Sequence, residues 1–420
     1  MPSNSKNIAE LLNTDTTIAV TDVADGSITT AKLAADAVTA AKLADDSVVT
    51  ANIVDGNVTA VKTTGVGRGK NLIINGAMQV AQRYSASSGE GTVTGLQDGY
   101  GGVDRFRLSG DTAARATVSK TNANTTPENG FKSAVKIDVT TASGTLSAGN
   151  YHYLGYRFEG RHLQHIKKGT SSAESLTLQF WVRSPKTGTH IVQIYDNDNN
   201  RGISQTYTVS SANTWEKKVM TFAGDTTGTL DEDQNYSLQL YWWLAAGSDY
   251  TTGSLRTSWA SWTANGTAAG QVNVLDNTSN DFYLTGVQME VGTNATDFEH
   301  RPYHEELHSC MRYYINTRSG GNSYGGIQMD RSVYANYAYG YTSFPAEMRN
   351  KPSITFYDGS GNAGSLTENG AGHNRGCVAN SHSSHGIAGA ESNGTGTGHF
   401  SSGAGAGYHL MGTYIADAEL

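Results

Sequence analysis

A ten-residue repeat near the amino terminus restricts how this chain can fold more than any other feature. Its first unit begins at Asp25, and further units follow at 35–44, 45–54 and 55–64. Apolar residues recur at every fifth position, a period that fits neither an α-helix nor a flat strand. Asp-Gly and Asp-Asp pairs mark the junctions between units, so each unit should consist of a short extended piece and a turn along an axis.

A single thin chain cannot bury this apolar stripe, whereas several identical chains can direct it toward a common axis. We therefore predict a stalk and hinge over residues 25–69 in which three chains meet, preceded by a docking segment at 1–24. The alternative is a disordered linker rich in Ala, Thr and Asp, but the strict register favours the stalk. The residues expected at the axis are Ile28, Leu33, Val38, Leu43, Val48, Ile53 and Val58.

Composition places the rest of the chain among β-rich proteins. Its 420 residues include 49 glycines and only 6 prolines, which is typical of short strands joined by tight turns. The formal net charge is −8, so no basic field attracts nucleic acid or anionic lipid. No apolar run approaches the ~18 residues that span a bilayer, and we expect a soluble protein without membrane insertion. The widely spaced Cys310 and Cys377 are expected to be free thiols.

Residues 70–303 show the period-two alternation of half-buried strands, clearest over 176–183, and predict a jelly-roll β-sandwich. In one strand the alternation places Trp242 in the core and Tyr241 and Trp243 outside. Outward aromatic rings beside amides can form a stacking platform for sugar rings. The candidate carbohydrate-binding residues are Trp181, Tyr241, Trp243, Tyr250, Trp259 and Trp262. A neighbouring subunit or the long loop itself could equally cover these rings.

Residues 304–420 predict a short helix followed by a smaller β-sandwich, the tip domain. Gly, Ser, Asn, Ala and His dominate residues 358–408, so we expect long exposed loops there. Because loops on a rigid scaffold often carry recognition, this end is the preferred receptor-contacting surface, ahead of the aromatic platform; a mere spacer is the alternative. The candidate contact residues are His373, Asn374, His382, His385 and His399.

Two motifs suggest metal chemistry, and neither is complete. The segment 304–308 reads H-E-x-x-H, in which His304 and His308 could bind zinc beside Glu305 as a general base, but no further ligand pattern follows. The segment 196–200 begins like a calcium loop, yet Arg201 occupies the position that requires glycine, so we interpret it as a turn. We therefore predict no metal, no cofactor and no catalytic residue, and a protein that is not an enzyme.

Two further segments resemble bacteriophage tail fibre proteins. Residues 71–83, NLIINGAMQVAQR, look like the start of a fibre domain. Residues 284–292 and 295–303, LTGVQMEVG and ATDFEHRPY, followed by Glu306-Leu307 and by CMRYY at 310–314, resemble a junction common in these fibres. The ten-residue repeats are similar to those of marine cyanophage fibres.

This resemblance implies a jelly roll similar to carbohydrate-binding modules, then a β-rich tip. It also implies a homotrimer of the virion, assembled in the host cytoplasm, whose amino terminus docks on a tail, adaptor or other structural protein. The distal domains would then attach to a host cell-surface glycan or receptor. A head or collar fibre that binds no receptor is the alternative, and a glycan depolymerase or zinc peptidase is a third interpretation.

The repeat predicts the number of chains in the particle. We expect light scattering on the purified protein to give three times the single-chain mass of 44.6 kDa. A single-chain mass would contradict the stalk and return residues 25–69 to a flexible linker.

Overall fold

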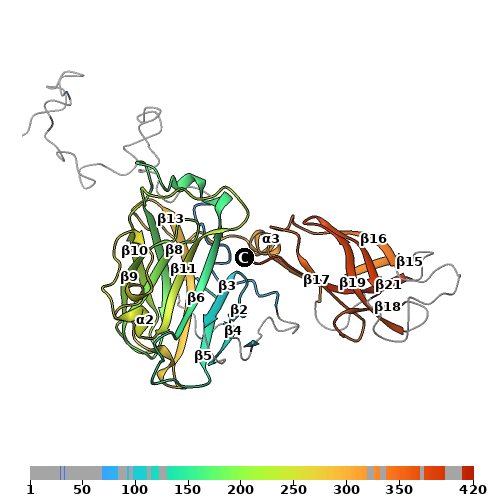
Figure 1. Cartoon of the computed structure of the whole chain (residues 1–420), viewed down its shortest axis with the longest axis horizontal. Coiled ribbons are helices and arrows are strands. Elements are labelled where there is room, and N and C mark those ends of the chain that lie inside the picture. The colour runs from blue at the N-terminus through green and yellow to red at the C-terminus, as the bar shows by residue number, and fades with distance from the viewer. Residues whose placement is uncertain are drawn as a thin grey trace, which may run out of the picture. The chain divides into compact units, whose positions relative to one another are not determined.

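A computed structural model describes residues 29, 33, 69–83, 92–93, 98–110, 115–122, 130–318, 326–331, 337–368, 373–392 and 409–420. Its large compact unit is Gly67–Leu420 (Figure 1). The predicted docking segment lies outside the described residues, and so does the predicted stalk and hinge except for Thr29, Leu33 and Gly69; Leu33 is 45% exposed. The three-chain axis therefore stays a prediction.

Two antiparallel sheets form the first body of this unit, and the predicted mainly-β sandwich is confirmed (Figure 1). In order, the first sheet contains β1 (Thr92–Val93), β4 (Ala116–Asn122), β5 (Ser133–Val139), β13 (Asp281–Val291), β7 (Leu176–Arg183) and β10 (Glu216–Phe222). The second contains β12 (Ala260–Ser261), β9 (Arg201–Val209), β8 (Gly188–Asp196), β11 (Tyr236–Ala246), β6 (Tyr151–Glu159), β3 (Phe106–Gly110) and β2 (Asp98–Tyr100).

The sandwich core is built by the alternation that the sequence shows. Leu178, Phe180 and Val182 of β7 are fully buried, as are Leu240 and Trp242 of β11. The rings of Phe180 and Trp242 meet edge to face with centroids 5.8 Å apart, a favoured aromatic geometry. The inward faces of both sheets therefore form one apolar cluster, which leaves the outward faces free for other uses.

The two segments that resemble phage fibres contact one another. The Asn71 amide donates to the carbonyl of Val287 at 3.1 Å, and its oxygen accepts from the Met289 N–H at 3.0 Å. The buried carboxylate of Glu306 accepts the backbone N–H of Asn75. These bonds close the sandwich at the point where the chain enters and leaves it.

The second body is a closed β-sheet with its own core. Strand β21 (His409–Asp417) pairs with β15 and β18 over its first half and with β14 and β17 over its second half. The strand path therefore returns to β21, so the predicted tip sandwich is a small barrel. The other strands are β14 (Tyr314–Asn316), β15 (Ile327–Arg331), β16 (Tyr337–Ser343), β17 (Ser353–Tyr357), β18 (Ser365–Glu368), β19 (His373–His382) and β20 (Gly386–Ser392).

The prediction of exposed loops is wrong for residues 365–368, 373–382 and 386–392, which form strands β18, β19 and β20. Their small residues serve the tight sheet: a Cβ at Gly386 would lie 2.4 Å from the carbonyl oxygen of Thr342. Ile387 and Ala390 from the same range are fully buried in the barrel core. Glycine and alanine here indicate close strand packing and not an irregular loop.

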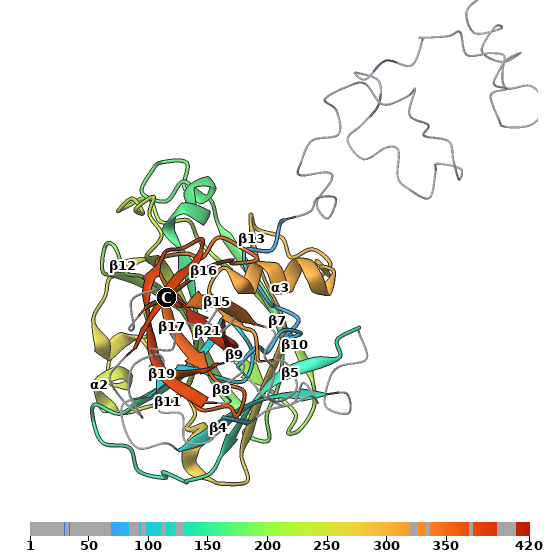
Figure 2. The same cartoon turned by 90° about the vertical axis from the view of Figure 1, so that its right-hand side faces the viewer.

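Helices are few and short in the described part of the chain. The longest is α3 (Tyr303–Met311), the helix expected between the two bodies (Figure 2). The others are α2 (Ser248–Thr251) and the 3₁₀ turns η5 (Gly160–His162), η6 (Gln164–Ile166), η7 (Ala264–Gly266) and η8 (Val274–Asp276). Among the described residues, no helix has the length and apolarity that crossing a membrane requires.

Buried ion pairs join the sandwich to the barrel. The Arg312 guanidinium, just after α3, donates two hydrogen bonds of 2.8 Å to the carboxylate of Glu159 at the end of β6. Arg105 pairs with Glu419 and lies over the Tyr313 ring, with 3.4 Å between guanidinium carbon and ring centroid. Because the Glu159 side chain is 0% exposed, its charge depends on this partner.

The Arg312–Glu159 pair predicts a large effect of Arg312→Ala on stability. Removing one partner of a buried pair typically costs about 3–5 kcal/mol, because the remaining charge is uncompensated. Arg161→Ala is the control: Arg161 lies 3.6 Å from the same carboxylate but is 43% exposed, and such pairs contribute about 0.2–1 kcal/mol. Urea unfolding of both variants measures the difference, and equal losses would contradict the buried role.

The same pair predicts acid sensitivity. Burial alone would raise the pKa of Glu159, but hydrogen bonds from Arg312 and Tyr313 lower it below the ordinary value overall. The carboxylate therefore stabilises the fold above the unfolded pKa of about 4.3, and this contribution is lost as the pH falls through the lower folded pKa. We expect the free energy of unfolding of wild type to approach that of Glu159→Gln as the pH falls from 6 to 3. Urea unfolding at each pH measures both values, and a constant difference between them would contradict this role.

Candidate aromatic binding pocket

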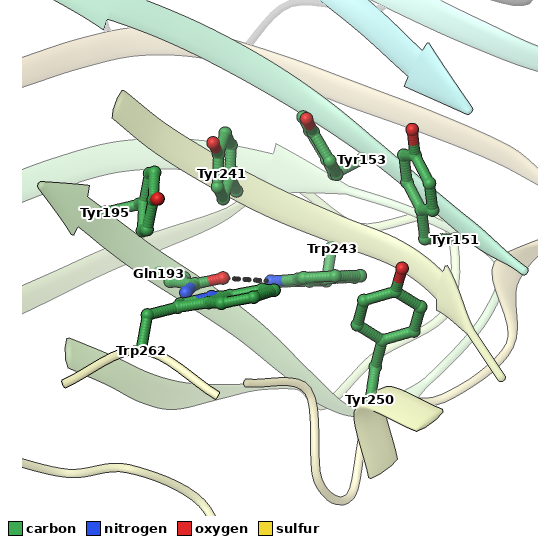
Figure 3. Close-up of a pocket in the computed structure, with 8 residues that line it drawn as sticks. All are labelled: Tyr151, Tyr153, Gln193, Tyr195, Tyr241, Trp243, Tyr250 and Trp262. Carbon is green, nitrogen blue, oxygen red and sulfur yellow. Dashed lines mark hydrogen bonds between the residues drawn. The ribbon is translucent and has the colours of Figure 1, made fainter. Parts of the chain in front are cut away.

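A pocket of about 290 Å³ opens on the outer face of the second sheet, near the lower end of the range of about 300–1,000 Å³ for ligand sites. It is lined by seven aromatic rings and one amide. The lining residues are Tyr151, Tyr153, Gln193, Tyr195, Tyr241, Trp243, Tyr250 and Trp262 (Figure 3). Strands β6, β8 and β11 provide six of them, so most of the pocket is fixed by sheet pairing.

Four tyrosines form a row across the three strands (Figure 3). Tyr151 and Tyr153 stack at a centroid distance of 5.8 Å, and Tyr153 lies 4.2 Å from Tyr241. Tyr241 in turn lies parallel to Tyr195 at 6.4 Å. Residues two apart in a strand share a face, which is why each strand brings its rings to the same side.

A second group of side chains lies across from this row (Figure 3). Trp243 from β11 contacts Tyr250 of α2, with ring centroids 5.5 Å apart. Trp262, just after β12, meets Tyr195 edge to face at 5.9 Å. The loops after β11 and β12 therefore add a wall to the sheet, and the rings leave a gap between the two groups.

Two tyrosine hydroxyls of the pocket, those of Tyr241 and Tyr195, stay neutral. Burial, with the nearby Tyr153, raises the pKa of Tyr241 well above its usual value, and burial with the nearby Asp196 raises that of Tyr195. Both groups therefore keep their protons at neutral pH. They present polar hydroxyls at the edges of apolar rings, a combination suited to ligands with both apolar faces and hydroxyl groups.

The structure brings four of the six aromatic candidates together, namely Tyr241, Trp243, Tyr250 and Trp262. Trp181 is not among the lining residues, because β7 belongs to the opposite sheet. Trp259 does not line the pocket either: its indole N–H donates to the Ala223 carbonyl at 2.7 Å and its ring packs against the sandwich core. A joint role of all six in one platform is therefore wrong.

Trp259 instead covers a buried cation. The Lys168 ammonium lies 5.4 Å from the Trp259 ring centroid, and its side chain is only 3% exposed. It pairs with the carboxylates of Asp196 and Asp225 and donates to the carbonyls of Thr227 and Gly228 at 2.9 and 2.8 Å. The calcium-like segment at 196–200 is thus the β8–β9 turn, and its first carboxylate binds a lysine.

Sequence reasoning missed Tyr151, Tyr153, Gln193 and Tyr195. Their signal was present as pairs spaced two apart, Tyr-x-Tyr at 151–153 and Gln-x-Tyr at 193–195. The sequence did not show that these two pairs lie on strands next to the strand of Tyr241 and Trp243. The structure shows this, because β11 pairs with β6 on one side and with β8 on the other.

The distal candidates that the structure describes do not form one site. His382 makes a 3.0 Å contact with the carbonyl of Pro352 at the end of β19, while His385 contacts Ser384 in the turn before β20. His373 and Asn374 begin β19, where Asn374 bonds to Thr367 at 2.9 Å. His399 lies outside the described residues. The described positions lie at the two ends of β19 and in the turn before β20, and not around a common loop surface.

The H-E-x-x-H segment lies on α3 with the side chains of His304, Glu305 and His308 exposed. Glu306 is the buried member, and it binds the backbone of Asn75. Within the described ranges no group of three or more His, Cys, Asp or Glu side chains is arranged to hold a metal ion. The buried residues of α3 thus face the junction described above.

Comparison with known proteins finds similarity only among solved structures. No family model and no curated protein matches the chain. A bacteriophage CBA120 tailspike protein 4 domain matches 53% of this chain and 21% of its own length, with 12% identity and a TM-score of 0.27. TmCBM61 in complex with β-1,4-galactotriose matches 53% of this chain and 98% of its own, with 10% identity and a TM-score of 0.26.

A family 11 carbohydrate-binding module from Clostridium thermocellum, in complex with a β-1,3-1,4-mixed-linked tetrasaccharide, covers 49% of this chain and 99% of its own. Its identity is 14% and its TM-score 0.25. At such low identities and TM-scores, the similarity gives no information about the ligand of this chain. The matched region spans about a fifth of the tailspike chain.

Proposed function

We propose that this chain is a virion fibre protein that attaches to a host cell surface by binding a glycan in the aromatic pocket. The observation that carries the proposal is the pocket lining of seven aromatic rings and one amide. Sugar rings present apolar C–H faces and hydroxyl edges, which aromatic faces and amides complement. The amino-terminal repeat supports the fibre, because it favours a trimer that displays three such pockets.

The proposal includes binding without cleavage. Most glycoside hydrolases use two carboxyl groups at the scissile bond, separated by about 5–9.5 Å. The eight lining residues contain no carboxylate. The pocket holds a sugar by stacking and hydrogen bonds, and multivalency in the trimer would raise the avidity of weak single sites. In this proposal the pocket contacts the host glycan, and the distal histidines do not.

Binding should depend on the aromatic rings of this pocket. We expect Tyr241→Ala or Trp262→Ala to weaken glycan binding by at least about 2 kcal/mol, roughly thirtyfold, because each removes a stacking surface. Trp181→Ala is the matched control, because Trp181 is equally half-buried but belongs to the opposite sheet. Binding is measured on a glycan array that includes xylohexaose, β-1,4-galactotriose and the mixed-linked tetrasaccharide. Chromatography of each glycan after incubation with the protein shows whether the glycan has been shortened.

Three results would contradict this proposal. A wild-type protein that retains no glycan, on the array or on host cells, excludes the attachment role. Shortened glycan chains after incubation exclude binding without cleavage and favour a depolymerase. A loss of binding in Trp181→Ala equal to that in Trp262→Ala would move the site away from the pocket.

A further inference from the structure

Gln193 is the one lining residue that is not aromatic, and its amide orientation is fixed. Its side-chain oxygen accepts the indole N–H of Trp243 at 3.1 Å (Figure 3). An indole nitrogen can only donate, so the amide must turn its oxygen toward Trp243. The amide nitrogen, Nε2, then has to point the other way, and its two hydrogens find no acceptor among the described residues.

Nε2 of Gln193 is buried and has no hydrogen-bond partner among the described residues. The residue as a whole is only 1% exposed, although it lines the pocket. Native proteins seldom leave a buried donor unsatisfied, because such a group has lost its water without gaining a partner. A partner from outside the chain, lodged in the pocket, would complete it.

A glycine leaves room for that partner. Gly202 of β9 lies beside Nε2, and a Cβ at this position would be 3.3 Å from Nε2 and 3.5 Å from Cδ1 of Trp262. A Cβ there would crowd the donor and would touch the Trp262 ring at an ordinary contact distance. The backbone of Gly202 is not in the left-handed region, so its conformation does not require glycine. The missing side chain leaves space beside Nε2.

We propose that Nε2 of Gln193 donates a hydrogen bond to an oxygen of a neutral sugar bound between the tyrosine row and Trp262, and that this bond selects which sugar is held. This inference rests on the proposed glycan-binding function. The lining carries no charged group, so the ligand portion that enters is neutral. A site with a buried donor rejects an analogue that lacks the accepting oxygen, because the donor is then left unpaired.

Trp243 acts as a positioning residue for this donor. Its N–H holds the Gln193 oxygen, while its ring contacts Tyr153 at a centroid distance of 5.6 Å. Trp243→Phe would keep a ring but release the amide to rotate. We expect this variant to discriminate less than wild type between a sugar and its deoxy analogue, as measured by the ratio of their two dissociation constants.

Two variants test the donor directly. Gln193→Leu removes it, and Gly202→Ala obstructs it while leaving the amide intact. We expect each to weaken binding of the retained neutral probe, among xylohexaose, β-1,4-galactotriose and the mixed-linked tetrasaccharide, by about 10- to 100-fold, or about 1.4–2.8 kcal/mol. Gln239→Leu is the control, because Gln239 is an equally buried amide of β11 that accepts from Arg157 and does not line the pocket.

Monodeoxy analogues of the bound probe give a readout that a merely structural role would not change. Wild type should lose affinity for one particular analogue, and Gln193→Leu should bind that analogue and its parent equally, as measured by isothermal titration calorimetry. If wild type binds but Gln193→Leu and Gly202→Ala match it within twofold, the donor role is overturned and the glycan function stands. If wild type binds no glycan at all, the proposed function itself is overturned.

Discussion

Strand β11 has to serve two surfaces at once, and the rest of the sandwich depends on how it does so. Trp242 points into the core against Phe180, while the adjacent Trp243 points outward and holds Gln193. A slip of one residue would exchange the two rings between core and pocket. Burial of Trp242, which is 0% exposed, therefore fixes the position of Trp243, so the stability of the core also defines the pocket geometry.

The alternation of β7 and β11 could be predicted from sequence because it is local. The assignment of strands to sheets depends on contacts between residues far apart in the sequence. The sequence therefore could not show that Trp181 and Trp243, which both face outward, lie on opposite sheets. The same limit hid Gln193, whose partner Trp243 is 50 residues away. Its free donor also depends on Gly202, a residue that sequence alone marks only as small.

The barrel shows a different limit. Sequence reasoning treated glycine and alanine as signs of loops, yet strand β20 contains two glycines and two alanines, and β19 contains one of each. A small closed sheet has little interior volume, and its strands approach too closely for larger side chains at positions such as Gly412, where a Cβ would lie 2.3 Å from the Tyr357 carbonyl oxygen. Low side-chain volume is a requirement of this architecture. Composition alone cannot distinguish that requirement from irregularity.

The ammonium of Lys168 is surrounded by two carboxylates and two carbonyl oxygens. Oxygen ligands of this kind bind calcium in many proteins. A metal ion with such ligands leaves when its concentration drops or a chelator competes for it. A lysine is covalently attached and has no dissociation constant. The turn between β8 and β9 therefore carries its own cation, and these ion pairs do not depend on the calcium concentration of the surroundings.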